Sequence, residues 1–130
     1  MIYQQLRKTK EEDLADNAKL TAILEWLKEK NALNISTYDV SKTSGYTDVI
    51  IVCEGQADLH NQAIANHLLT KARENGMKVI SKEGIEHGHW ILIDVADVVV
   101  HIFLNQTRRY YDIDELFAKV RDLDPEGITK

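Results

Sequence analysis

Two histidines, His87 and His89, stand one residue apart and form the only close pair among the five histidines of the chain. In an extended segment the side chains of residues i and i+2 point the same way, so both imidazoles could bind one metal ion. No cysteine accompanies the pair, and a third ligand would have to come from scattered carboxylates. One hypothesis is therefore a metal-dependent nucleotidyl transferase or hydrolase that uses His87, His89 and nearby carboxylates. The alternative, which we adopt, is that both are polar loop residues ahead of a strand.

Cys53 and His101 are the candidates for a nucleophile and its base. Cys53 ends the most apolar run of the chain, where burial raises the pKa of a thiol and makes it unreactive. His101 lies in an apolar stretch, in phase with Val99 and Phe103, which is typical of a hydrogen-bonded residue in a core or at a sheet edge. The sequence therefore disfavours cysteine-histidine catalysis.

The carboxylates are poorly arranged for metal-dependent phosphoryl transfer. A nucleotidyl transferase needs paired carboxylates, usually Asp-x-Asp on one strand, to hold two metal ions. Asp48 stands alone on its predicted strand, and Asp112 with Asp114 lies at the start of a predicted helix, where capping accounts for both. No glycine-rich loop follows a strand to bind phosphate. We therefore predict no catalytic residue, no metal and no cofactor, and we expect the chain not to be an enzyme.

The composition bounds the size of the fold and the charge of a partner. The chain has 130 residues, of which 44% are hydrophobic and 28% charged, as in a globular protein with one domain. The net charge is -5, and residues 31–104 contain five basic and nine acidic side chains. A protein that binds nucleic acid through its phosphates would show a basic stripe. The charge thus disfavours direct nucleic-acid binding and favours a basic partner.

Nothing in the sequence indicates a membrane or an oxidising compartment. The single cysteine cannot form an internal disulfide, and no stretch approaches the roughly 18 apolar residues of a membrane span. The first 20 residues include three consecutive acidic residues and lack the apolar region of a signal peptide. We expect a cytoplasmic protein without a membrane partner.

Hydrophobic periodicity predicts three helices. The first covers about residues 12–31, with apolar residues at i, i+3, i+4 and i+7. The second begins at Asp58 as its N-cap and runs to about Asn75, with Gly76 ending it in a left-handed conformation. The last begins at Asp112, where Glu115 completes a pattern like a capping box. Residues 1–19 are expected to be a partly disordered or helical lead, and residues 122–130 a loose tail.

Five strands are predicted, at residues 35–40, 49–53, 77–81, 90–94 and 98–104. The run 49–53 is continuously β-branched, which is typical of a strand covered on both faces. The last two strands are separated by three residues, so they must form an antiparallel hairpin, whereas the helix at 58–75 permits a parallel crossover. The predicted fold class is α+β, a mixed sheet of about five strands covered by helices.

The strand at 90–94 carries the most informative surface pattern. Trp90, Leu92 and Asp94 share one face of the strand, whereas Ile91 and Ile93 share the other. If the isoleucines point inward, Trp90 and Leu92 form an exposed apolar anchor. Residues 83–97 contain four acidic side chains and no lysine or arginine, which suits a basic partner. The alternative is that Trp90 packs under a helix.

The same region resembles a known family. Its elements E-G, W-x-x-x-D and V-V-V-H-x-F appear at residues 83–84, 90–94 and 98–103, and this order resembles the ribosomal silencing factors, also called the Iojap family. The element D-V-x-x-x-S-x-x-T-D matches residues 39–48, and the final R-x-x-Y-x-x-x-x-L matches residues 108–116. The resemblance covers about residues 20–121, which we take as the domain.

The resemblance implies a bacterial factor that binds the large ribosomal subunit through universal large-subunit ribosomal protein fourteen, on the face that meets the small subunit. It implies that the factor blocks subunit joining and represses translation, especially under nutrient limitation, without a reaction. The implied fold is similar to nucleotidyltransferases without their catalytic residues. The implied contacts are Trp90 and Leu92 as apolar anchors and Asp94, Asp48 and Glu83 as acceptors for lysine or arginine. A homodimer off the ribosome is also implied.

One loop departs from the family pattern. Residues 54–60 correspond to the family element T-G-x-S-x-R-Q, and of that element this chain keeps only the glycine. The usual glycine ahead of Asp97 is Ala96. The element from Trp90 to Asp94 is intact.

Overall fold

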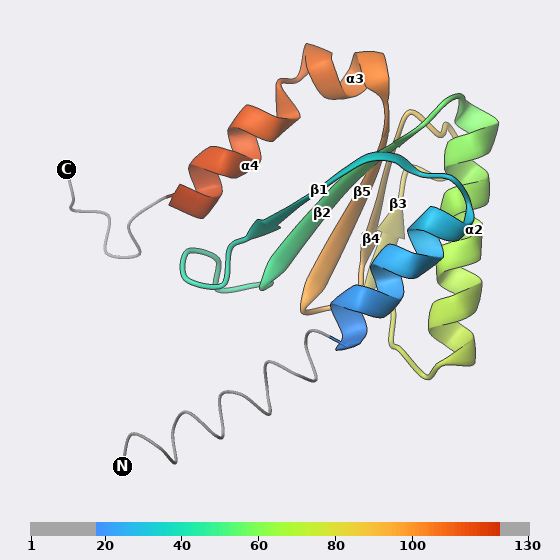
Figure 1. Cartoon of the computed structure of the whole chain (residues 1–130), viewed down its shortest axis with the longest axis horizontal. Helices are drawn as coiled ribbons and strands as arrows, with labels where there is room; N and C mark the ends of the chain where they lie inside the picture. Colours follow the sequence, from blue (N-terminus) through green and yellow to red (C-terminus); the bar gives the residue numbers. More distant parts are fainter. Residues whose placement is uncertain (1–17, 123–130) are drawn as a thin grey trace.

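A five-stranded sheet with helices on both faces forms the centre of the molecule (Figure 1). The computed structural model describes residues 18–122, so the expectations for residues 1–17 and 123–130 lie outside the described part. The predicted α+β class with a mixed sheet of five strands is confirmed. The strands are β1 (Leu33–Asp39), β2 (Val49–Gly55), β3 (Ser81–Glu83), β4 (Trp90–Asp94) and β5 (Val98–Leu104).

The strand order in the sheet is β1-β2-β5-β4-β3. The pairs β1–β2, β5–β4 and β4–β3 are antiparallel, and the central pair β2–β5 is parallel. The predicted hairpin of the last two strands is thereby confirmed, and the sheet does contain a parallel pair. The strand that follows the crossover helix, β3, runs parallel to β2 but lies at the far edge, beyond β5 and β4.

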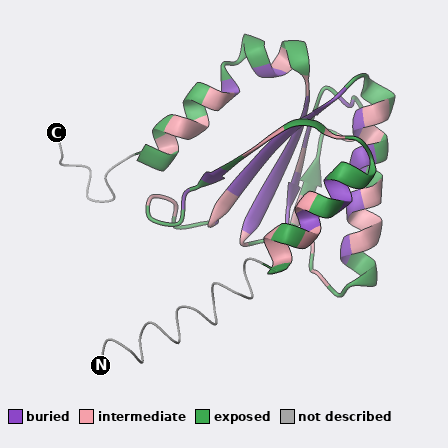
Figure 2. Ribbon diagram, in the orientation of Figure 1, coloured by how far each residue is buried: buried purple, intermediate pink, exposed green. Residues whose placement is uncertain are grey.

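The two central strands are the most deeply buried elements (Figure 2). All of β2 except Val49, and all of β5 except Leu104, are buried. Their continuous β-branched runs match this environment, because a strand covered on both faces needs apolar side chains on both.

One face of the sheet is covered by the helix over residues 18–29 and by α2 (Asp58–Glu74) (Figure 1). This face holds the larger apolar core. Its members from the two helices include Ile23, Leu27, Ile64 and Leu68, and those from the sheet include Ile51, Ile91, Ile93, Val100 and Ile102. The start of the first helix, predicted near residue 12, lies outside the described residues.

The opposite face is covered only in part, by α3 (Asn105–Tyr110) and α4 (Ile113–Asp122) (Figure 1). The smaller core on this side includes Tyr38, Val52, Phe103 and Ile113. Contacts of α4 are made with β1 at one edge of the sheet. On this same face of the sheet, β4 lies beyond β5 from β1, and some of its side chains therefore stay partly exposed.

Two local predictions are wrong, and one helix was missed. The strand predicted at 77–81 lies later in the chain: β3 covers Ser81–Glu83, which pair in register with Asp94, Ile93 and Leu92 of β4. Asp58 is the first residue of α2 and Ala57 is its N-cap, without a side-chain cap hydrogen bond. The helix α3 was not predicted. The left-handed end of α2 at Gly76, with a φ of 70°, is confirmed.

The turn between β4 and β5 contains a non-glycine residue, Ala96, at a φ of 75°. An L-residue in this region is strained by contact of its Cβ with the backbone, whereas glycine is not. We expect Ala96→Gly to raise the free energy of unfolding by about 0.5–1 kcal/mol, measured by urea denaturation. The same substitution at exposed, helical Ala63 should instead lower it by about 1 kcal/mol. A loss of stability in Ala96→Gly would contradict the strain argument.

Candidate partner-binding surface

The face of β4 divides as the alternation of its residues predicts. Ile91 and Ile93 are completely buried under the helices, and the exposed fraction of Trp90 on the other face is 37%. Leu92 is half-buried on the same face as Trp90. The alternative, in which Trp90 packs beneath a helix, is therefore wrong, and an aromatic and an aliphatic side chain lie together at the surface.

Trp90 is held by its neighbours although it is partly exposed. Its indole Nε1–H donates a hydrogen bond to Nδ1 of His101 at 3.0 Å. Its ring lies against Phe103 and Tyr111, with centroid distances of 4.9 and 5.5 Å. The indole is thus fixed by one polar and two aromatic contacts.

His101 is buried and hydrogen-bonded, as the sequence predicts. Burial lowers the pKa of its imidazole to about 4, so the ring is neutral at neutral pH. The folded-state pKa lies below the unfolded value of about 6.5. The stability associated with neutral His101 is therefore present above pH 6.5 and lost as the pH falls toward 4.

We expect the free energy of unfolding to fall by about 2 kcal/mol between pH 7.5 and pH 5 because of His101. The measurement is urea denaturation at both pH values, on the wild type and on His101→Asn, which cannot titrate there. The difference between the two proteins isolates the histidine from all other groups. Equal pH dependence in both would contradict the assignment.

Asp94 is buried, with an exposed fraction of 1%, and both its oxygens are bonded within the chain. Oδ1 accepts a hydrogen bond from the backbone N–H of Ala96 at 2.8 Å, and Oδ2 accepts one from the Tyr46 hydroxyl. That bond is the main reason why the pKa of Tyr46 is raised. Asp94 forms no ion pair within residues 18–122. Both Asp94 oxygens are therefore occupied within the chain, and its role as an acceptor for a partner's lysine or arginine stays a prediction.

The other two predicted acceptors lie at different places. Glu83 is exposed and pairs in register with Leu92, so both side chains share one face. Asp48 is half-buried at the start of β2, and its backbone N–H bonds the carbonyl of Asp97. The structure thus brings Glu83 next to the Trp90–Leu92 pair and leaves Asp48 separated from β4 by β5.

Tyrosines extend this surface beyond the predicted residues. Tyr110 and Tyr111, 81% and 54% exposed, follow Trp90 around a hollow of about 480 Å³ that includes His89 and Gln106. Tyr46, 67% exposed, lies at the Asp94 end of β4, where its hydroxyl bonds the Asp94 carboxylate. In the sequence, the adjacent pair Tyr110-Tyr111 within a polar segment is the signal that could have identified these two residues as part of the surface. We call Trp90, Leu92, Glu83, Tyr46 and Tyr111 the β4 surface.

A smaller cavity of about 240 Å³ lies between the sheet and α4, at the edge of this surface. Leu92 and His101 line it together with Phe117 from α4. The Thr47 hydroxyl in its wall is buried and has no hydrogen-bond partner among the described residues. The sheet and α4 are therefore not closely packed beside Leu92.

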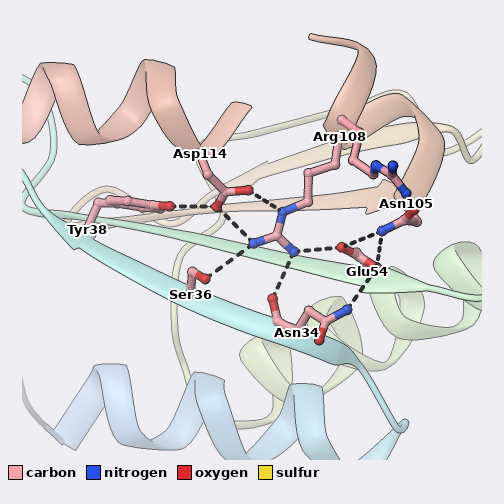
Figure 3. A network of polar contacts seen from close by, with 8 residues as sticks. Asn34, Ser36, Tyr38, Glu54, Asn105, Arg108 and Asp114 are labelled. Carbon is pink, nitrogen blue, oxygen red and sulfur yellow. Dashed lines mark hydrogen bonds and ion pairs between the residues drawn. The ribbon is translucent and has the colours of Figure 1, made fainter. Parts of the chain in front are cut away.

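A polar network centred on the buried side chain of Arg108 attaches α3 and α4 to the sheet (Figure 3). The Arg108 guanidinium donates hydrogen bonds to the carboxylates of Glu54, at 2.9 Å, and Asp114, at 2.8 and 2.9 Å. It also bonds the backbone carbonyl of Asn34 and the hydroxyl of Ser36 on β1. Tyr111, which follows α3, is thereby kept beside Trp90.

The network changes the proton affinities of its members. Bonds from Arg108 are the main cause that lowers the pKa of Asp114. Burial and the bond to Asp114 raise the pKa of Tyr38 to about 12. The sequence prediction that Asp114 caps the helix start is wrong. Its two carboxylate oxygens accept hydrogen bonds from Arg108 and Tyr38 instead.

Cys53 and His101, the candidates for a nucleophile and its base, face opposite sides of the sheet, because His101 is in register with Val52. Cys53 is buried, and burial raises the pKa of its thiol to about 12, as expected for an unreactive cysteine. His87 is exposed, and Nε2 of His89 lies 3.4 Å from a carboxylate oxygen of Asp58. Within residues 18–122 no three histidine, cysteine or acidic side chains are grouped closely enough to hold a metal ion. Over the same residues, no helix combines the length and the hydropathy needed to cross a bilayer.

Comparison with known proteins gives a consistent result. The sequence profile described as "Ribosomal silencing factor during starvation" matches residues 12–130. The ribosomal silencing factor RsfS of Bacillus subtilis is 38% identical over 74% of this chain and 83% of its own length. That of Chromobacterium violaceum is 36% identical over 82% of this chain and 88% of its own length.

Solved structures agree with the sequence comparison. A crystal structure of a Chromobacterium violaceum protein has a TM-score of 0.72 at 35% identity, over 74% of this chain and 80% of that one. A Bacillus halodurans structure also has a TM-score of 0.72, at 32% identity, over 77% and 93% of the two chains. With a matching profile over most of its length and relatives above 30% identity, the chain belongs to the ribosomal silencing factor family.

Proposed function

We propose that this protein binds the large ribosomal subunit through universal large-subunit ribosomal protein fourteen, blocks joining of the small subunit and represses translation, especially under nutrient limitation. The family description, which mentions starvation, supports the condition. A mouse relative, 24% identical over 45% of its own length, is named for assembly of the mitochondrial ribosomal large subunit, and this name supports the choice of subunit.

The β4 surface is the observation that carries the proposal. Trp90 and Leu92 lie together at the surface on a face of the sheet that α3 and α4 cover only in part. Partly exposed aromatic side chains held in a fixed place are the residues that most often dominate protein interfaces. A surface of this kind suits a protein partner better than a small substrate.

The mechanism needs no chemical step. A folded domain seated on the large subunit, at the face that meets the small subunit, excludes the small subunit by its volume. The names of the relatives describe a regulatory role, which supports a protein without catalytic activity. Trp90 and Leu92 would supply the apolar contact, and the acidic groups would select the partner.

A basic partner fits the charge of this region. Glu83 is an exposed acceptor beside Leu92, and Asp48 is a second acceptor at the start of β2. Asp94 can accept a bond from a partner's lysine or arginine only after the Tyr46 hydroxyl leaves it. Glu83 therefore takes the leading role among the three proposed acceptors. We also assign the protein to the cytoplasm and to a homodimer when it is off the ribosome.

Electrostatic attraction should be visible in the association rate. Because acidic groups on this protein would attract a basic ribosomal protein, we expect the association rate to fall by about tenfold from low to physiological ionic strength. Stopped-flow mixing with isolated large subunits measures this rate. Glu83→Gln should reduce the salt dependence, and a rate that is independent of salt would contradict the proposed charge complementarity.

Sedimentation with isolated ribosomal subunits tests the function. The protein should migrate with the large subunit and not with the small one, and its addition should reduce the yield of joined ribosomes. Leu59→Ala is a suitable control variant, because Leu59 is 78% exposed on α2, the helix that covers the opposite face. Failure of the wild type to bind the large subunit would refute the proposal.

A further inference from the structure

The polar atom of Trp90 is already bonded inside the protein. Its indole N–H donates to Nδ1 of His101, which pairs in register with Leu92 on the neighbouring strand. The N–H is therefore not available to a partner. What Trp90 presents at the surface is the carbon part of its ring system.

His101 is itself firmly placed. Its exposed fraction is 7%, and its ring stacks on Phe103 at 6.0 Å with an interplanar angle of 11°. The ring of Phe117 on α4 also contacts it, with a centroid distance of 5.1 Å and an interplanar angle of 42°. Because burial keeps the imidazole neutral at neutral pH, one ring nitrogen retains its lone pair, and the bond from the indole requires that this is Nδ1, with the proton on Nε2.

We infer that His101 is a positioning residue for the β4 surface: it fixes the indole of Trp90 in the orientation that the partner binds. This inference rests on the proposed function. His101 need not touch the partner, because it lies behind Trp90 and acts through the hydrogen bond to Nε1.

The benefit is preorganisation. A partly exposed tryptophan without an internal bond can adopt several rotamers, and the partner must select one of them. When His101 restricts the ring beforehand, the entropy of ordering is lost during folding rather than during binding. Removal of the acceptor should therefore weaken binding about two- to tenfold while the other contacts of Trp90 remain.

Two variants with side chains of nearly equal shape isolate the effect of the hydrogen-bond acceptor at position 101. In His101→Asn the side-chain oxygen can occupy the place of Nδ1, whereas His101→Leu has the same branching and no acceptor. Both remove the imidazole ring, so any cost of the lost packing is shared. Val100→Ala is the control for lost stability, because Val100 is buried on the opposite face of β5.

Each variant is measured in two ways. The first is the dissociation constant for isolated large ribosomal subunits. The second is the hydrogen-exchange rate of the Trp90 indole N–H by NMR, with the indole of buried Trp26 as a reference in the same spectrum. We expect His101→Leu to exchange faster at Trp90 and to bind more weakly than His101→Asn, with Val100→Ala close to wild type in both.

The outcomes separate the two proposals. Equal exchange and equal affinity of the Asn and Leu variants would overturn the positioning role. Faster exchange in His101→Leu without loss of affinity would overturn it as well, because the bond would then be irrelevant to binding. If wild-type protein did not bind large subunits, the proposed function would fail, whereas the exchange rates would still report whether His101 holds Trp90.

Discussion

Trp90→Ala is expected to weaken binding to the large ribosomal subunit by about thirtyfold or more, while the protein remains folded. The substitution removes the largest apolar side chain of the β4 surface and also the ring against which Tyr111 packs. A central tryptophan in a protein interface typically accounts for about 2 kcal/mol or more of binding energy. The dissociation constant, measured by titration of labelled protein with large subunits, gives the loss directly.

The control for Trp90 must preserve the fold and change an aromatic ring elsewhere. Trp26→Phe meets this need, because Trp26 is buried in the core on the opposite face of the sheet. It should reduce stability without a comparable loss of affinity. If Trp90→Ala binds as tightly as wild type and shows wild-type circular dichroism, the β4 surface is not the contact.

Arg108→Ala is expected to lower the free energy of unfolding by about 3–5 kcal/mol. Arg108 is 6% exposed, and Glu54, its partner on β2, is 5% exposed. Without the guanidinium the Glu54 carboxylate is left in the interior with only the side-chain amides of Asn34 and Asn105. Breaking one side of a buried ion pair is costly for this reason. Thermal and urea denaturation would measure the effect.

Two further variants test the origin of this loss. Arg109→Ala changes the neighbouring arginine, whose only side-chain bond within residues 18–122 is an exposed contact to Asn105, and should cost less than about 0.5 kcal/mol. Adding Glu54→Gln to Arg108→Ala should recover part of the stability, because the uncharged amide can still accept bonds from the two asparagines. A double variant as unstable as the single one would show that lost packing, and not the unpaired charge, is responsible.

The alternation of residues 90–94 was sufficient to predict which side of β4 faces the solvent. It works because the side-chain period of a strand is two, and only Ile91 and Ile93 suit the core. The hairpin with β5 was predicted correctly from the connection of three residues between the two strands. The alternation did not predict that Asp94 is buried and bonded to Tyr46, which lies 48 positions earlier in the chain.

The helix α3 could not be found from periodicity. Its six residues, from Asn105 to Tyr110, are polar, and the only buried one is Arg108. What holds the segment is an ion pair to Glu54, 54 positions away, and a local pattern does not reveal such a partner. For the same reason the sequence suggested capping for Asp114, whose carboxylate is bound by Arg108 and Tyr38. Long-range polar contacts are the part of this fold that lies beyond pattern analysis.

The position of β5 between β2 and β4 has a consequence for synthesis of the chain. Val98–Leu104 is the last strand to be made, yet it is central, so β2 and β4 have no partner on that side until it emerges. Pairing across such sequence separations is slow, and exposed apolar strand edges promote aggregation. Folding of the sheet should therefore be a late and concerted event. A nascent chain stalled before Val98 would carry two open apolar edges and would be a substrate for chaperones or proteases.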